Sequence, residues 1–324
     1  MDDIYAKIDE LEMPPEFGGN TEEERTVICD IGDFLSRELP SRELIIDPWL
    51  PKQGLAMVHA PRGIGKTFFS LNVGYAAASG GSFLGWKANK PNGVLLLDGE
   101  MPASTLQARL AAIVAASDKE ATAPFKILTP DLQPKNRLSF NLSRSDDQES
   151  IKPHLEGVSL IIVDNIATLC RNGKENDSES WIPIQEWALR QRASGRSVLF
   201  IHHSGKGGMQ RGTSSREDVL DTVINLRKPS DYEPSQGARF EVHFEKSRGF
   251  HGDDAAPIEA QLTTDIHGLP MWTTITLEDS VYLKVIDLFN EGMKQNEIAE
   301  EVGRNKSNIS RMIKKAREEG RING

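Results

Sequence analysis

Residues 60–67 hold the clearest chemistry in the sequence: Ala60, glycines at 63 and 65, and the pair Lys66 and Thr67. Glycines let the backbone curl and turn its N–H groups toward phosphate oxygens. Lys66 would contact the β- and γ-phosphates of a nucleoside triphosphate, and the Thr67 hydroxyl would hold Mg²⁺. Ala60 stands where this motif has its first glycine, a position that tolerates small residues. We therefore predict a site for ATP and Mg²⁺ formed by Arg62, Gly63, Ile64, Gly65, Lys66, Thr67 and Phe68.

Two other apolar segments end in carboxylates. Residues 160–163 run into Asp164, a pattern in which the aspartate binds Mg²⁺ through water. Residues 94–97 run into Asp98 and, two positions later, Glu100. Hydrolysis requires a carboxylate near the γ-phosphate to orient and deprotonate water. We assign that role to Glu100, because Asp98 lies nearer the strand.

A third apolar segment, residues 198–201, ends at His202, His203 and Ser204. Paired histidines suggest either a zinc site or core residues, but neither has a second ligand pair nearby at metal spacing. We predict instead that one of them, His203, senses the γ-phosphate and moves the following loop.

The elements that position these residues follow from the same apolar runs. Residues 55–59, 94–97, 160–163 and 198–201 read as short buried strands, and residues 66–78, 102–116 and 181–194 have helical spacing. Buried strands that alternate with helices indicate a parallel sheet covered on both faces. The runs at 219–226, 240–246, 258–263 and 271–277 alternate like antiparallel or mixed edge strands. The sequence thus predicts an α/β fold with a mostly parallel central sheet.

Composition divides the chain into three parts. Residues 1–44 are polar and acidic and read as an arm, residues 45–277 form the α/β domain, and residues 278–324 are helical in pattern. The net charge of −10 excludes a uniformly basic coat for nucleic acid, although a local basic site is compatible with it. The acidic N-terminus does not resemble a signal peptide, and no apolar run approaches bilayer length. With two distant cysteines, Cys29 and Cys170, the chain reads as a cytoplasmic protein without a membrane partner.

Together these segments resemble the RecA-like P-loop ATPases, and specifically the RepA-type hexameric replicative helicases of plasmids. The more specific similarities are residues 49–54 (WLPKQG), 97–102 (LDGEMP) and 201–207 (IHHSGKG). The resemblance covers about residues 45–275. It implies a homo-oligomeric ring, a hexamer, with ATP at subunit interfaces and Glu100 as the catalytic base. It also implies that the loops after Asp164 and His203 face a central pore for single-stranded DNA.

Residues 246–249 resemble the Lys-x-Arg finger of RecA-like rings, in which a neighbouring subunit's cations stabilise the transferring phosphate. Lys246 and Arg248 lie on one side of an extended strand, so both side chains can point at one anion. Arg211 is an alternative finger or a DNA contact in a pore loop, and the sequence does not separate these. Lys174 and Lys206 are further basic residues of the predicted pore loops and favour translocation along DNA.

Residues 278–324 read as a helix-turn-helix. A helix ends at Gly303, Asn305 can cap the next one, and residues 306–318 form a basic helix with a buried apolar stripe. We predict that Lys306, Ser307, Asn308 and Arg311 face the major groove of duplex DNA and that Lys314 and Lys315 face phosphates. A small protein-docking domain with a solvated basic face is the alternative.

Three functions agree with these motifs. The first is a DNA-dependent ATPase of the replicative or plasmid helicase type. The second is a nucleotide-switched DNA-binding regulator, loader or partition factor that does not unwind DNA. A kinase is the third and the least favoured, because no acceptor-binding lid follows the phosphate loop.

Overall fold

The computed structural model describes residues 28–39, 41–135, 139–171, 181–204 and 217–322. The chain divides into two compact units, Met1–Ser41 and Arg42–Gly324. The first contains helix α1 (Ile31–Ser36), in which no residue is buried. Arg42 belongs to the second unit, in which its guanidinium pairs with the Asp221 carboxylate at 3.1 Å.

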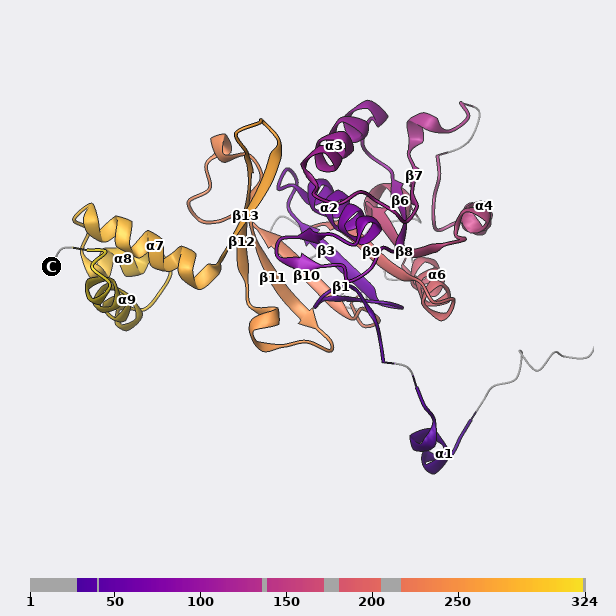
Figure 1. Cartoon of the computed structure of the whole chain (residues 1–324), viewed down its shortest axis with the longest axis horizontal. Coiled ribbons are helices and arrows are strands. Elements are labelled where there is room, and N and C mark those ends of the chain that lie inside the picture. Colours follow the sequence, from indigo (N-terminus) through magenta and orange to yellow (C-terminus); the bar gives the residue numbers. More distant parts are fainter. Residues whose placement is uncertain (1–27, 40, 136–138, 172–180, 205–216, 323–324) are drawn as a thin grey trace, which may run out of the picture. The chain divides into compact units, whose positions relative to one another are not determined.

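Nine strands of the described chain form one sheet, in the order β13-β12-β11-β10-β3-β9-β8-β6-β7 (Figure 1). The strands from β10 to β7 in this order run parallel to one another. Their bounds are β3 (Leu55–Ala60), β6 (Gly93–Asp98), β7 (Phe125–Leu128), β8 (Val158–Asp164), β9 (Ser197–His203) and β10 (Thr222–Arg227). The prediction of a mostly parallel central sheet is confirmed.

The remaining strands of the sheet extend it in antiparallel fashion. They are β11 (Arg239–Ser247), β12 (Ile258–Thr264) and β13 (Pro270–Thr276). One prediction about this region was wrong: β10 is not an edge strand, because it pairs in parallel with β3 on one side and with β11 on the other. Its residues 222–226 are all buried within the central sheet, and Val223, Ile224 and Leu226 are its apolar members.

Helices cover both faces of the sheet. Successive residues of a strand point to opposite faces, so Ala56 and Val58 pack in one hydrophobic cluster and Leu55 and Met57 in the other. The first cluster includes residues of α2 (Lys66–Ser79) and α3 (Ala103–Ala116). The second includes residues of α4 (Ser145–Ile151), α5 (Ile166–Leu169) and α6 (Ile182–Ala193).

Several small elements were not predicted. Short strands pair as two antiparallel ribbons, β1 (Leu44–Ile46) with β2 (Leu50–Pro51) and β4 (Ser82–Phe83) with β5 (Trp86–Lys87). They place Trp49 and Trp86 against Phe69 of α2, in edge-on and tilted ring contacts. These rings close the core beside the first turns of α2. The described 3₁₀ turns are Pro130–Leu132, Lys152–His154, Pro234–Gln236 and Gly252–Ala255.

The C-terminal segment consists of α7 (Leu277–Asn290), α8 (Gln295–Glu301) and α9 (Lys306–Glu318). These helices have a hydrophobic cluster of their own, with Val285, Ile298 and Ile309 fully buried. The Asn305 side chain accepts a hydrogen bond from the backbone N–H of Asn308, the cap that the sequence predicts for α9. Among the described helices of the whole chain, none is both long and apolar enough to span a bilayer.

Candidate functional site

The phosphate loop connects the carboxyl end of β3 to the first turn of α2. Gly63 and Gly65 have φ values of 77° and 110°, a left-handed region that side chains rarely adopt. The backbone N–H groups of Lys66, Thr67 and Phe68 lie in the first turn of α2, where a helix offers them no acceptor of its own. A phosphate at this point would meet those N–H groups and the positive end of the helix dipole.

Lys66 is folded back onto its own loop. Its Nζ donates to the carbonyl oxygens of Ala60 at 3.0 Å and Pro61 at 2.7 Å. Burial lowers the pKa of Lys66 to about 8, against the opposing effect of Asp164 and Glu100. A phosphate anion would supply stronger acceptors than these two carbonyls and would favour the charged ammonium.

Asp164 ends β8 and is buried beside the first two turns of α2. The Ser70 hydroxyl donates to its Oδ2 at 2.8 Å, and the Thr67 hydroxyl is a second hydrogen-bond partner. Burial raises the pKa of Asp164 to about 6, although these hydroxyls and Lys66 act to lower it. The contact with Ser70 was not predicted, because nothing in the sequence shows which turn of α2 faces the end of β8.

This set of oxygen donors fits Mg²⁺. A carboxylate and a hydroxyl, Asp164 and Thr67, lie together where the phosphate loop would place the β- and γ-phosphates. Mg²⁺ keeps several waters and takes few protein ligands, so these two residues and the phosphates would complete its shell.

Glu100, Asn165 and His203 come together from the ends of three neighbouring parallel strands, β6, β8 and β9. The Asn165 side-chain amide donates to Oε2 of Glu100 and lies 3.2 Å from Nε2 of His203. Nε2 of His203 is itself 3.6 Å from Oε2 of Glu100. The Glu100 side chain remains 58% exposed, so water can reach its free oxygen. Asn165 was not among the predicted site residues.

The contacts of His203 indicate its protonation. Burial lowers its pKa, and the charge of Lys66 acts in the same direction, so the ring is neutral near pH 7. Nε2 of His203 lies 3.2 Å from the Asn165 amide nitrogen and 3.6 Å from Oε2 of Glu100, so the tautomer of the neutral ring decides whether Nε2 accepts from Asn165 or donates to Glu100. In either case a movement of His203 changes its contact with this pair.

Asp98 has a different environment from Glu100. It is buried, and its Oδ2 accepts the backbone N–H of Met101 at 3.1 Å. Burial, opposed by such backbone hydrogen bonds, raises its pKa to about 6. Gly99 between them is required by close packing, since a Cβ there would lie 2.5 Å from the Thr168 hydroxyl. Asp98 thus holds the turn that carries Glu100, which favours Glu100 as the base.

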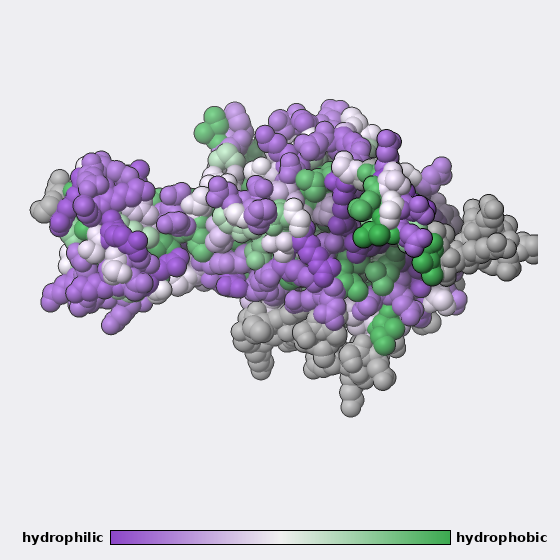
Figure 2. Space-filling view, turned by 90° about the horizontal axis from the view of Figure 1, so that it is seen from below, coloured by the Kyte–Doolittle hydropathy of each residue, from purple (hydrophilic) through white to green (hydrophobic). Residues whose placement is uncertain are grey.

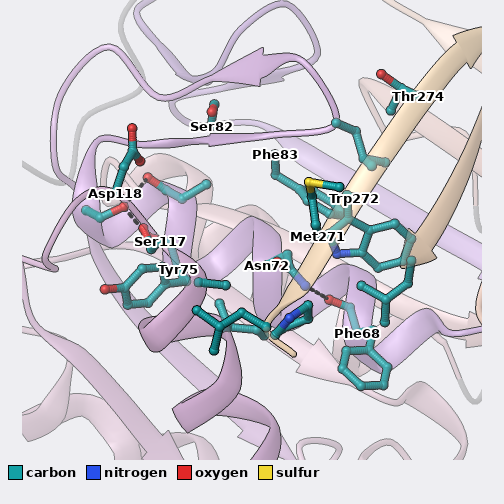
Figure 3. Close-up of a pocket in the computed structure, with 18 of the residues that line it drawn as sticks. Phe68, Asn72, Tyr75, Ser82, Phe83, Ser117, Asp118, Met271, Trp272 and Thr274 are labelled. Atoms are coloured by element: carbon teal, nitrogen blue, oxygen red, sulfur yellow. Dashed lines mark hydrogen bonds between the residues drawn. The ribbon is translucent and has the colours of Figure 1, made fainter. Parts of the chain in front are cut away.

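Arg62 and Phe68 differ in what they offer a nucleotide. Arg62 is exposed at the tip of the loop, whereas the Phe68 ring lies under the Arg109 guanidinium, 4.5 Å from it. Figure 3 shows that the Phe68 side chain lines a groove along α2, together with Asn72, Tyr75 and Trp272. The groove encloses about 460 Å³. Phe68 can therefore give the phosphates only its backbone N–H, and Ile64 is a buried core residue.

Lys246 and Arg248 lie toward the amino ends of the parallel strands, whereas the phosphate loop of the same chain follows the carboxyl end of β3. Lys246 pairs with Val223, which pairs with Met57, near the amino end of β3. Both cations donate to the backbone carbonyl of Asp218, Lys246 at 3.4 Å and Arg248 at 3.3 Å. They converge on one acceptor, but within one chain they do not belong to the site around Lys66.

The predicted pore residues Lys174, Lys206 and Arg211 lie outside the described residues. The six predicted DNA contacts of the C-terminal segment lie on α9. Lys306, Ser307 and Arg311 are exposed there, and Asn308 is half-buried and accepts from Arg311. Lys314 and Lys315 are exposed as well, although the Lys315 Nζ lies 4.8 Å from the centre of the Tyr282 ring of α7. Figure 2 shows the mostly hydrophilic surface over these helices, on the left.

A family model described as an AAA domain matches residues 21–209 of the chain. A comparison of the chain with curated proteins finds no match. The matched segment contains the whole phosphate loop, Glu100, Asp164, Asn165 and His203. Lys246, Arg248 and the C-terminal helices lie beyond it.

Proposed function

We propose that this chain, which belongs to the AAA domain family and is an ATPase of the P-loop class, is a DNA-dependent ATPase that assembles as a ring. One observation carries the proposal: the ends of parallel strands bring Glu100, Asn165 and His203 together beside Lys66 and Asp164. Hydrolysis of a terminal phosphate needs a carboxylate base, a polar sensor and a phosphate-binding lysine close together, and all three lie at the carboxyl ends of the parallel strands.

Each residue then has a defined task. The backbone of residues 62–68 and Lys66 bind the β- and γ-phosphates. Thr67 and Asp164 would hold Mg²⁺, which would neutralise phosphate charge when bound. Glu100 accepts a proton from the attacking water. Asn165 fixes one carboxylate oxygen of Glu100 and leaves the other for water. His203 responds to the γ-phosphate through its contact with Asn165.

The position of Lys246 and Arg248 supports an assembly. They lie toward the amino ends of the parallel strands, and their own phosphate loop follows the carboxyl end of β3, so we assign their action on a γ-phosphate to a neighbouring copy. A head-to-tail arrangement that closes on itself gives a ring in which every copy donates and receives these cations. We propose a hexamer with hydrolysis shared between neighbours.

DNA is the proposed partner. Residues 306–315 place an exposed cationic surface on one helix in a chain whose net charge is −10. Such a surface fits a duplex phosphate backbone. Lys206 and Arg211, in the segment after His203, are the proposed contacts with single-stranded DNA in a pore. A replicative or plasmid-type helicase would use both.

The decisive experiment is the ATP hydrolysis rate with and without single-stranded DNA, on a sample whose mass in solution is measured by light scattering. We expect a ring-sized mass and a rate that DNA increases. A rate that DNA leaves unchanged, with intact duplex binding, would favour the nucleotide-switched regulator, loader or partition factor. A sample without ATP hydrolysis would refute the enzyme assignment.

A further inference from the structure

His59 lies on β3 directly before the phosphate loop, and its side chain is fully buried. Both ring nitrogens are bonded: Nδ1 lies 2.9 Å from the Ser204 hydroxyl, and Nε2 lies 2.8 Å from Oε2 of Glu245. The roles given above to the nucleotide-site residues do not include it. A buried ring with two specific polar partners fixes the positions of both.

The Ser204 contact joins His59 to residues of the nucleotide site. The backbone N–H of Ser204 donates to the Ala60 carbonyl at 2.9 Å, and the same carbonyl accepts from Nζ of Lys66. Ser204 also directly follows His203 in the chain. When Lys66 turns from the Ala60 carbonyl to a phosphate, this carbonyl loses that donor and keeps the N–H of Ser204.

The Glu245 contact joins His59 to β11, the strand that ends near Lys246 and Arg248. Val223 pairs with Lys246 and Ile224 with Phe244, so Glu245 is the extra residue of a β-bulge in β11. A bulge re-aims the side chain it carries. Oε1 of Glu245 also accepts from Asn225 at 2.7 Å. Although burial acts to raise the pKa of Glu245, the hydrogen bonds from Asn225 and His59 keep it below its usual value.

We infer that His59 is a positioning residue that joins the nucleotide site of one subunit to the Lys246–Arg248 strand end that the subunit offers to its neighbour. Glu245 immediately precedes Lys246, so a displacement of the bulge moves both cations. This inference rests on the proposed sharing of hydrolysis between subunits. It adds the direction of coupling: the state of a subunit's own phosphate loop sets the position of its cations in the next site.

A mixing experiment isolates this role. Arg248→Ala subunits keep an intact phosphate loop. Glu100→Gln subunits keep intact cations and still bind ATP through Lys66, so activity in the mixture comes from interfaces where the two meet. His59→Asn is then added only to the Glu100→Gln subunit, which binds ATP but hydrolyses it slowly. Asparagine reaches as far as Nδ1 and keeps the Ser204 contact, whereas glutamine reaches as far as Nε2 and keeps the Glu245 contact.

We expect His59→Asn in that subunit to reduce the restored rate about tenfold or more, the scale of a small misplacement of a catalytic group. The matched control places His59→Asn in the Arg248→Ala subunit instead, whose cations are already defective, and should leave the restored rate close to that of the parent mixture. His59→Gln in the Glu100→Gln subunit loses the Ser204 contact and should lower the restored rate as well. Glu245→Gln in the same subunit should lower the restored rate as His59→Asn does. Melting curves show whether His59→Asn folds, and Glu245→Gln replaces it in the test if it does not. A restored rate that His59→Asn and Glu245→Gln leave unchanged would overturn the inference alone. A parent mixture without restored activity would overturn both the shared hydrolysis and the inference.

Discussion

The Asn165 side-chain amide donates a hydrogen bond to Oε2 of Glu100, which reaches it from the neighbouring strand. The same side chain caps α5, because its Oδ1 accepts the backbone N–H of Thr168 at 3.2 Å. Asn165 therefore ties the position of the proposed base to the end of the strand that carries Asp164. Its two contacts can be separated by substitution.

Asn165→Asp keeps an oxygen for the cap but replaces the amide donor with a second negative charge beside Glu100. We expect kcat to fall by about 10- to 100-fold, since the base loses its orientation, and the melting temperature to stay close to that of the wild type. Steady-state kinetics and a melting curve measure the two. A normal kcat would mean that Glu100 does not depend on this contact.

Glu100→Gln should bind ATP and hydrolyse it at least about 100-fold more slowly, the scale of losing a general base. Asp98→Asn provides the comparison, because Asp98 holds a buried turn and should affect stability more than the chemical step. Single-turnover hydrolysis with both variants separates the roles. Full activity in Glu100→Gln, with loss of activity in Asp98→Asn, would identify Asp98 rather than Glu100 as the base.

The affinity for ATP should depend on pH through Lys66. Its pKa is about 8 in the free protein because of burial, and a bound phosphate favours the charged form and raises the pKa. Affinity should therefore be constant well below pH 8 and should weaken above it, by at most about tenfold for each pH unit. Titrations between about pH 7 and about pH 9.5 test this. Lys66→Ala lacks the titrating group, so its weak affinity should show no such change, and a flat wild-type profile would contradict the account.

Removal of the residues after Thr276 deletes α7, α8 and α9 together with their separate hydrophobic cluster. The sheet keeps its own core, so we expect a folded protein that retains basal ATP hydrolysis. Duplex binding should weaken, and each lost phosphate contact should reduce the salt-dependence slope by about 0.9. Unchanged duplex affinity, with loss of stimulation by single-stranded DNA, would instead identify a docking or assembly domain.

Local patterns were enough to predict the central strands and the phosphate loop. Apolar runs such as residues 160–163 mark buried strands, and the glycines before Lys66 mark a turn that only a few sequences can form. β7 was not predicted because Phe125–Leu128 is short and includes a lysine. The position of β10 depends on which strand it pairs with, and pairing between distant segments leaves no local signal.

The same reason explains the residues of the site that were not predicted. Asn165 and Ser70 are ordinary polar residues in sequence, and their roles appear only when β6, β8 and β9 align and α2 packs over them. Lys246 and Arg248 share a backbone acceptor, the Asp218 carbonyl, and their action on a phosphate stays a prediction. Their distance from their own phosphate loop follows only from the order of the strands in the sheet.

The most direct test of the central claim is phosphate release from ATP by the wild-type chain and by Lys66→Ala, at the same concentration and with melting curves for both. Lys66 is a buried phosphate-binding charge at the start of α2 and is not part of the hydrophobic core, so the variant should fold. We predict that the wild type hydrolyses ATP and that the rate of the variant is at least about 100-fold lower. This is the scale of losing one preorganised group that stabilises charge in the transition state. Hydrolysis at the wild-type rate by folded Lys66→Ala protein would contradict the assignment of this loop as the site of ATP hydrolysis.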